Sequence, residues 1–249
     1  GGTGGDPPSI QPSRCTHVRG STRCTCPAGF TISGRDNNLC TDMDECRVFP
    51  PGRLCVHGCT NSPGSFRCFC PAGYHLAADG SSCTDVDECE HGSHTCGAEH
   101  LCVNTFGGFQ CVTVGCPNRR NATYIRTTPT RCERNPCLQG DQSCLQAPNS
   151  ISFQFLSVVS NVSTPRVLFR VSAARVLGDT LRFALVGGRS HGCFSLQRSG
   201  RQTGTLLLVV PVRGPSTLEA EVEMSELEGP ALLGRYVTKV TLFVSAFDF

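Results

Sequence analysis

The sequence is organised around the stretch Asp85 to Cys111, DVDECEHGSHTCGAEHLCVNTFGGFQC, which repeats the pattern of Asp42 to Cys68, DMDECRVFPPGRLCVHGCTNSPGSFRC. In both copies an acidic D-x-D-E precedes a cysteine, and the third cysteine begins C-x-N-x-x-x-x-F-x-C. The pattern recurs after about 43 residues, and a self-similar unit of this length indicates a tandem array of small modules rather than one globule.

Each copy carries oxygen donors that suit a hard divalent cation. Calcium takes six to eight oxygens from carboxylates, amides and backbone carbonyls. A disulfide from the first to the third cysteine of a copy would bring the Asn beside the acidic pair, so the site depends on disulfide formation. Solvated carboxylates are the alternative, and an EF-hand does not fit, because Cys46 stands where that loop needs a ligand. The candidate side chains are Asp42, Glu45 and Asn61, and then Asp85, Glu88 and Asn104.

The cysteine content indicates the compartment. The chain has 19 cysteines among 249 residues, nearly all of them in the first part of the chain, which indicates a disulfide framework in an oxidising environment. Zinc is a competing use of closely spaced cysteines, with His57, His91 and His94 as candidate partners. Zinc sites reuse short C-x-x-C pairs, which this sequence lacks, so disulfides are the favoured interpretation.

The remaining composition argues against several classes of protein. The formal net charge of +2 gives no reason to expect a nucleic-acid partner. Apolar runs such as Leu206 to Val210 fall far short of the roughly 20 residues of a membrane span. No G-x-S-x-G, H-E-x-x-H or phosphate-binding glycine loop occurs, so we do not expect an enzyme. Because the sequence shows neither an initiator Met nor a signal peptide, we expect a processed or partial chain.

The repeated pattern resembles the calcium-binding EGF-like module, whose cysteines pair one to three, two to four and five to six. The resemblance implies Ca²⁺ as the bound ion, and the C-x-N-x-x-x-x-F-x-C pattern matches the family's signal for β-hydroxylation of Asn61 and, less well, of Asn104. The implied carbonyl ligands are Met43, Ser62 and Ser65, and then Val86, Thr105 and Gly108. The implied disulfides are Cys46–Cys59, Cys55–Cys68, Cys70–Cys83, Cys89–Cys102, Cys96–Cys111 and Cys116–Cys132.

The stretch from Cys15 to Cys40 resembles the second half of such a module. By alignment its four cysteines are the third to the sixth, so Cys26 is expected to pair with Cys40, and the orphans Cys15 and Cys24 to join each other. No D-x-D-E precedes them, and we expect no calcium here. Phe30 stands where this family packs an aromatic ring on the following module, although filling its own small core is the alternative.

The third module closes over a long insert, PNRRNATYIRTTPTR at 117–131, which is the most basic stretch of the chain. Asn121 begins an acceptor sequence for N-glycosylation, which implies an exposed loop, and a second acceptor begins at Asn161. A sulfated glycosaminoglycan such as heparin, or an acidic protein, would suit these arginines, and a solvated loop is the alternative. The polyanion candidates are Arg119, Arg120, Arg126, Arg131 and Arg134.

The character of the chain changes after Cys137 and Cys144, which can close a short loop together. From Ile151 onward apolar residues alternate, which predicts about seven antiparallel strands over one core, most simply a β-sandwich. The alternating sets are Phe153 and Phe155; Val167, Phe169 and Val171; Leu181, Phe183 and Leu185; Phe194 and Leu196; Leu218, Ala220 and Val222; and Val240, Leu242 and Val244.

This last part resembles the fibulin-type C-terminal module, through CERNPC at 132–137, ISFQFL at 151–156, GRQTG at 200–204 and KVTLFVSAFDF at 239–249. EGF-like units followed by this module is the order of the short fibulins. The resemblance implies a secreted calcium-binding glycoprotein of the extracellular matrix that adapts matrix proteins to one another and to cell-surface receptors. A soluble or shed ligand or receptor fragment that signals through one receptor is the alternative.

The expected architecture is therefore a tandem of small disulfide-rich EGF-like modules followed by an all-β antiparallel sandwich-like domain. The expected boundaries are 1–13 for a flexible linker, 14–40 for an incomplete EGF-like module, 41–83 and 84–132 for calcium-binding EGF-like modules, the latter with a long closing loop, and 133–249 for the C-terminal domain.

Cys193 is the cysteine that this scheme leaves unpaired. In an expected strand CFSLQ, Phe194 and Leu196 point to the core, so alternation places Cys193 on the outer face. There it would form an intermolecular disulfide or carry a capped thiol. A turn formed by the two preceding residues is the alternative, and it would let Cys193 tuck inward as a small apolar side chain.

Overall fold

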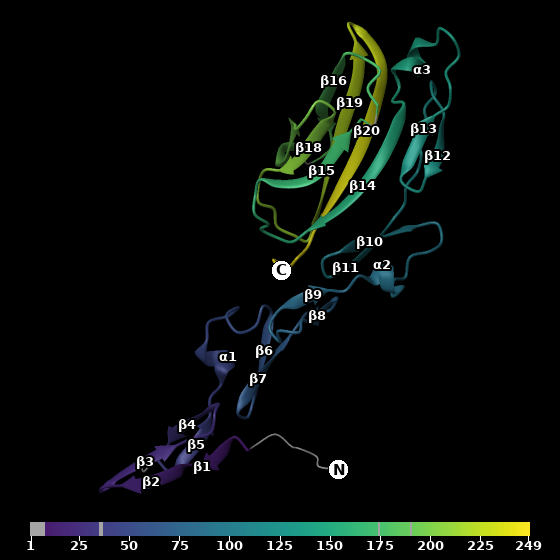
Figure 1. The fold of residues 1–249 in the computed structure, drawn as a ribbon. Helices are drawn as coiled ribbons and strands as arrows, with labels where there is room; N and C mark the ends of the chain where they lie inside the picture. The colour runs from purple at the N-terminus through teal and green to yellow at the C-terminus, as the bar shows by residue number, and fades with distance from the viewer. Residues whose placement is uncertain (1–7, 35–36, 174, 190) are drawn as a thin grey trace. The chain divides into compact units, whose positions relative to one another are not determined.

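The computed structural model describes residues 8–34, 37–173, 175–189 and 191–249 (Figure 1). The chain divides into two compact units, Gly1–Val86 and Asp87–Phe249, which we consider separately. The disulfides join Cys15–Cys24, Cys26–Cys40, Cys46–Cys59, Cys55–Cys68, Cys70–Cys83, Cys89–Cys102, Cys96–Cys111, Cys116–Cys132 and Cys137–Cys144, the same pairs that the sequence analysis expects.

The first unit begins with a small sheet in the order β1-β5-β4 and a separate hairpin of β2 and β3. The flexible linker expected over 1–13 is wrong for Ile10–Pro12, because this extended segment pairs with β5, and the Ser13 amide donates to the Asn38 carbonyl. Residues 1–7 lie outside the described part. The strands are β1 (Ile10–Pro12), β2 (Arg14–Val18), β3 (Ser21–Thr25), β4 (Phe30–Ser33) and β5 (Leu39–Asp42).

The second module follows without a spacer and consists of a short helix and two hairpins. Cys46 on the helix and Cys59 on the first hairpin form a disulfide, which ties the two together. The second hairpin is closed by Cys70–Cys83. The elements are α1 (Glu45–Val48), β6 (Gly58–Ser62), β7 (Ser65–Phe69), β8 (Tyr74–Leu76) and β9 (Cys83–Asp85).

The second unit begins with the helix and hairpin of the third module, α2 (Glu88–His91), β10 (Leu101–Thr105) and β11 (Gly108–Val112). The basic insert, which we expected to be a loop of this module, instead contains β12 (Tyr124–Thr128) and continues into β13 (Arg131–Arg134). The expected module boundary between 132 and 133 therefore falls inside a strand. The backbone of β13 hydrogen-bonds to β12 and to β14 of the C-terminal sheet. Cysteine spacing alone does not predict this strand pairing.

The C-terminal domain has two sheets (Figure 1). The larger has the order β12-β13-β14-β20-β19-β16, and the smaller has the order β15-β18-β17. Neighbouring strands are antiparallel except β14 and β20, which run parallel and so depart from the expected antiparallel sandwich. The remaining elements are α3 (Gln142–Gln146), β14 (Ser150–Val158), β15 (Arg166–Ser172), β16 (Thr180–Gly187), the 3-10 turn η1 (His191–Cys193), β17 (Phe194–Arg198), β18 (Thr203–Leu208), β19 (Ser216–Glu228) and β20 (Ala231–Val244).

The core lies between these two sheets. Leu206 and Leu208 from the smaller sheet and Val222, Val240 and Leu242 from the larger are almost completely buried there. The strand β18 was not among the expected alternating sets, because TLLL is buried on both faces and shows no alternation. A fully buried strand of this kind gives no period-two signal.

Two expectations about the core are wrong. Phe153 and Phe155 lie opposite Lys239 and Thr241 in the β14–β20 register, on the face away from the core, while Leu156 packs against it. Val167 is exposed because the β15 register shifts between Val167 and Phe169. A bulge moves the side chains beyond it to the opposite face of the strand, and no residue pattern in the sequence predicts its position.

We predict that Leu242→Ala lowers the free energy of unfolding of the C-terminal domain by about 2 to 5 kcal/mol, because it leaves a cavity at a fully buried position. Val167→Ala, at an exposed position that the alternation wrongly assigns to the core, should change it by less than about 0.5 kcal/mol. Urea denaturation of both variants measures the difference. Equal losses would mean that the two faces of the domain are assigned incorrectly.

Candidate functional site

The candidate calcium site of the second module starts at Asp42, the last residue of β5. Its Oδ2 accepts a hydrogen bond from Nδ2 of Asn61 at 2.7 Å, and its Oδ1 accepts one from the amide of Gly64, also at 2.7 Å. Asn61 lies on β6, nineteen positions further along the chain. The structure therefore brings together a carboxylate and an amide that the sequence analysis proposes as ligands of one ion.

Glu45 is the third side chain of this set and the first residue of α1. It is only 8% exposed, and its Oε2 is buried without a hydrogen-bond donor among the described residues. A buried carboxylate oxygen without a partner is costly unless a cation lies against it. Because Cys46 is bonded to Cys59, the disulfide anchors α1 beside β6, the strand that carries Asn61.

Asp44 is a residue that the sequence analysis left out of the ligand set. One of its carboxylate oxygens, Oδ1, is also buried without a hydrogen-bond partner among the described residues. Its other oxygen lies 3.4 Å from Nε of Arg47. The D-x-D-E motif contains this residue, so the signal was present in the sequence, and Asp44 adds negative charge beside the site.

The junction between the first two modules is formed around the same residues. The Met43 amide donates to the Gly29 carbonyl at 2.9 Å. Gly29 has φ +85°, and a Cβ there would overlap the carbonyl of Gly64 in the turn of the second module. Phe30 lines a hollow with Pro63 and Gly64, as expected for an aromatic that lies against the following module. Ligand candidates and intermodule contacts therefore share one segment.

The third module repeats part of this arrangement. Glu88 begins α2, and its Oε2 is likewise buried without a hydrogen-bond partner among the described residues. Asn104 lies on β10, and Thr105 pairs with Gly108 where the hairpin closes. Cys89–Cys102 joins helix and hairpin as in the second module. Asp85 and Val86 end the first unit, where the Val86 amide donates to the Gly73 carbonyl at 3.0 Å, matching Met43 and Gly29.

The donor set fits calcium better than zinc. His94, Cys96 and Cys102 lie close enough to share a metal, but both cysteines are in disulfides and offer no thiolate. His94 accepts a hydrogen bond from the Cys96 amide and packs edge-on against Phe109. Carboxylate, amide and carbonyl oxygens, by contrast, are the donors that Ca²⁺ takes.

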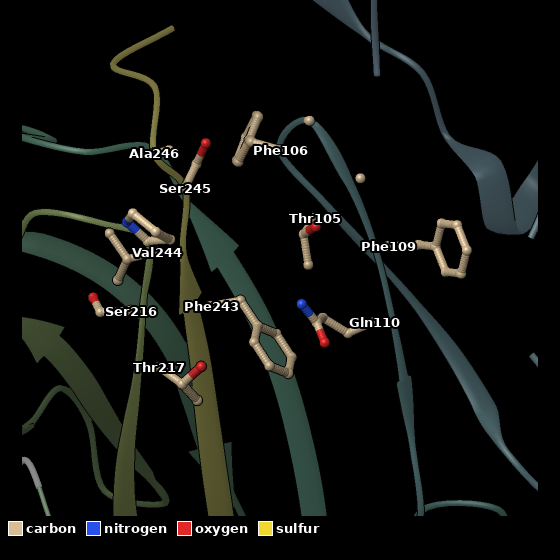
Figure 2. Close-up of a pocket in the computed structure, with 13 residues that line it drawn as sticks. Thr105, Phe106, Phe109, Gln110, Ser216, Thr217, Phe243, Val244, Ser245 and Ala246 are labelled. Atoms are coloured by element: carbon tan, nitrogen blue, oxygen red, sulfur yellow. The ribbon is translucent and has the colours of Figure 1, made fainter. Parts of the chain in front are cut away.

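The β10–β11 hairpin also contacts the C-terminal domain (Figure 2). The Phe106 amide donates to Oγ of Ser157 on β14 at 3.2 Å. A hollow of about 390 Å³ lies between the hairpin and the ends of β19 and β20, with Phe106 near Ser245 and Gln110 facing Phe243. The hairpin that carries Asn104 and Thr105 therefore also holds the C-terminal sheet.

The turn before β9 is held by Asp79. Hydrogen bonds from the Ser82 hydroxyl and from the amides of Ser82 and Ser81 lower the pKa of Asp79 to about 2. Because the folded-state pKa lies below the ordinary value of 3.8, the contribution of this turn to stability is present above pH 3.8 and is lost as the pH falls toward 2. Asp79 therefore holds this turn as a carboxylate at neutral pH.

The basic stretch does not form one cluster. Arg134 donates from Nη1 to the carbonyls of Cys144 and Ala147 at 2.8 and 2.6 Å, so it holds the end of α3. Arg131 is paired with Glu133 at 3.2 Å. Arg119, Arg120 and Arg126 are exposed. The structure thus leaves three of the five arginines available to a polyanion.

The modification candidates lie at the surface, and the odd cysteine is half-buried. Asn121 and Asn161 are both exposed. Cys193 is unpaired and half-buried, ends the turn η1 rather than beginning a strand, and packs against the core. This placement agrees with the inward alternative for Cys193 rather than with the outward one.

Family profiles match three stretches of the chain. Residues 65–88 match the complement Clr-like EGF-like domain, and residues 85–137 match the calcium-binding EGF domain. Residues 149–246 match the fibulin C-terminal Ig-like domain. None of the helices in the described part of the chain is long and apolar enough to cross a membrane.

Similar proteins agree with these profiles. The chain is 45% identical to fibulin-7 of Mus musculus over 259 residues and 45% identical to fibulin-7 of Homo sapiens over 258, in each case covering 100% of this chain and 59% of the relative. It thus spans less than two thirds of these relatives. The solved structure of the human desmocollin-1 ectodomain is 14% identical and has a TM-score of 0.29, with 38% of this chain and 20% of the desmocollin chain covered. A similarity this low does not assign a fold.

We predict that Glu45→Gln weakens one of the chain's calcium-binding events at least about tenfold, a loss of roughly 1.4 kcal/mol, because it removes a charged ligand while keeping the side chain's size. Isothermal titration calorimetry measures the change. Glu99→Gln, which alters an exposed carboxylate outside the site, is the matched control and should leave both events unchanged. Wild-type affinity in the Glu45 variant would remove Glu45 from the site.

Proposed function

We propose that this chain, which belongs to the fibulin family, acts as a calcium-dependent structural adaptor that joins extracellular-matrix proteins to one another and to cells. Fibulins with EGF-like domains are secreted matrix proteins, and the disulfide framework suits that oxidising location. The observation that supports the proposal most strongly is the junction of Asp42, Glu45 and Asn61, where a buried carboxylate oxygen without a donor lies at the contact between two modules.

Calcium is the ion we assign to these junctions. In the second module the proposed ligands are the side chains of Asp42, Glu45 and Asn61 and the carbonyls of Met43, Ser62 and Ser65. The third module repeats the sequence pattern with Asp85, Val86, Glu88, Asn104, Thr105 and Gly108. The ion supplies positive charge that offsets the buried carboxylates. The chain's own residues supply the donors and the disulfides that hold those donors together.

The role we propose is non-enzymatic. The carboxylates gather at module junctions, and the partly exposed Glu219, Glu221 and Glu223 on β19 form ion pairs with Arg189, Lys239 and Arg235 respectively. Neither arrangement places an acid and a base beside a nucleophile. What the chain offers instead is a series of separate surfaces, and this suits an adaptor that contacts several partners at once.

The adaptor role and the alternative, a soluble ligand or receptor fragment that signals through one receptor, predict different partners. Crosslinking mass spectrometry of the secreted protein in native matrix distinguishes them. We expect several matrix proteins to be crosslinked, with fewer of them when calcium is chelated. Crosslinks to one signalling receptor and to no matrix component would contradict the adaptor role and favour the alternative.

A sulfated polysaccharide is a further partner that we propose, limited to Arg119, Arg120 and Arg126. Replacing all three with Ala should lower the salt concentration that elutes the protein from heparin, because exposed charges are screened within about 8 to 10 Å. Arg131→Ala combined with Glu133→Ala, which removes one exposed ion pair and leaves the net charge unchanged, is the control. Unchanged elution of the triple variant would leave only a solvated basic segment.

A further inference from the structure

The acceptor Asn161 lies on a turn that is fixed from both sides. Its neighbours Ser160 and Val162 are only 7% and 8% exposed. The Asn161 amide donates to the Val212 carbonyl at 2.8 Å, and its φ of 55° places it in the left-handed region that Asn tolerates. The side chain of Asn161 is nevertheless exposed. Anything attached to it therefore leaves the domain from a well-defined point.

The last residues of the chain run beside this turn. The Ser160 amide donates to the Phe247 carbonyl at 2.8 Å, and the Ser160 hydroxyl donates to the Ser245 carbonyl at 2.6 Å. The Phe247 ring is half-buried, with its centroid 5.3 Å from that of Phe249. Beyond β20 the segment has no strand partner among the described residues, so a few contacts hold it.

A hollow of about 380 Å³ joins these two features, because Asn161, Arg213, Phe247 and Asp248 all line it. Its volume lies in the range of sites that hold a small molecule. Phe247 is one of its lining residues, and the face of an aromatic ring carries partial negative charge, while Arg213 and Asp248 offer exposed polar groups. A sugar ring presents C–H groups on its faces and hydroxyl groups at its edge, which matches this lining.

We propose that an N-glycan on Asn161 seats its first N-acetylglucosamine in this hollow against Phe247, and thereby holds the C-terminal segment on the domain. The inference rests on the proposed function in one respect, that the chain is secreted. Asn121, the other acceptor, is also exposed and serves as the comparison site.

The attachment follows the chemistry of the secretory pathway. Asn161 Nδ2 forms a bond to C1 of the first N-acetylglucosamine, the bond between C1 and the pyrophosphate of a lipid-linked oligosaccharide donor breaks, and Nδ2 loses one proton as the lipid pyrophosphate leaves. Ser163 completes the acceptor sequence. After folding, the first sugar remains covalently held within reach of the hollow, so it contacts Phe247 without a separate binding step.

A double-mutant cycle tests the contact in the full chain secreted from mammalian cells. Glycopeptide mass spectrometry measures occupancy of Asn161. We expect Ser163→Ala, which removes the glycan, to lower the Tm of the C-terminal domain by about 2 to 4 °C, and Ser163→Thr, which keeps it, to have no effect. In a Phe247→Leu background, removal of the glycan should change Tm by less than half as much. Asn121→Gln should act equally in both backgrounds.

Two results would overturn the proposal. One is an occupied Asn161 whose removal lowers Tm equally in the wild-type and Phe247→Leu backgrounds. The other is an unoccupied Asn161 in a protein that is still secreted, a result that does not affect the proposed function. Failure of the wild-type chain to be secreted, by contrast, would contradict both the glycan contact and the proposed function. If Ser163→Ala reduces secretion, peptide-N-glycosidase F treatment of the secreted Asn121→Gln chain, with and without Phe247→Leu, removes the Asn161 glycan alone and leaves Asp at position 161 in both backgrounds.

Discussion

The disulfide between Cys46 and Cys59 is the constraint on which the candidate site depends, because it anchors a helix that starts with a buried Glu45 beside the strand that carries Asn61. Small modules bury too little surface to hold carboxylates together by packing alone. With the disulfide in place, burial of the Glu45 carboxylate oxygen without a donor is the remaining cost, and a bound cation would offset it. The disulfide and the cation would therefore act on the same few residues.

In the third module, too, one element carries ligand candidates and also contacts a neighbouring part of the chain, here the C-terminal domain. The β10–β11 hairpin carries ligand candidates near its tip, and at that tip the Phe106 amide donates to Ser157 of the large sheet. The insert that leaves this module supplies β12 and β13 to that sheet. The third module is thus joined to the domain by hydrogen bonds along a strand edge as well as by the chain itself, and its ligand residues lie close to the contact.

Much of this arrangement could be predicted from the sequence, and the failures have physical causes. The repeat predicts the modules, and the resemblance to EGF-like units implies the disulfides that the structure contains. Strand alternation failed at Phe153, because the face of β14 that lies away from the core also carries aromatic side chains, which stand beside Lys239 and Thr241 of β20. Arg134 looked like part of a basic patch, but its carbonyl partners on α3 are set by tertiary structure. The pairing of Ile10–Pro12 with β5 contradicts the flexible linker that the Gly- and Pro-rich composition predicts.

The central claim is that calcium orders the junction at Asp42 through residues of both neighbouring modules. Hydrogen exchange of two amides tests it most directly: Met43, which donates to the Gly29 carbonyl, and Gly64, which donates to Asp42. Calcium should slow exchange of both at least about tenfold, because the ion binds the ordered state preferentially, and leave the buried Leu206 amide in the C-terminal core unchanged. Identical exchange at Met43 and Gly64 with calcium and with chelator would contradict the account.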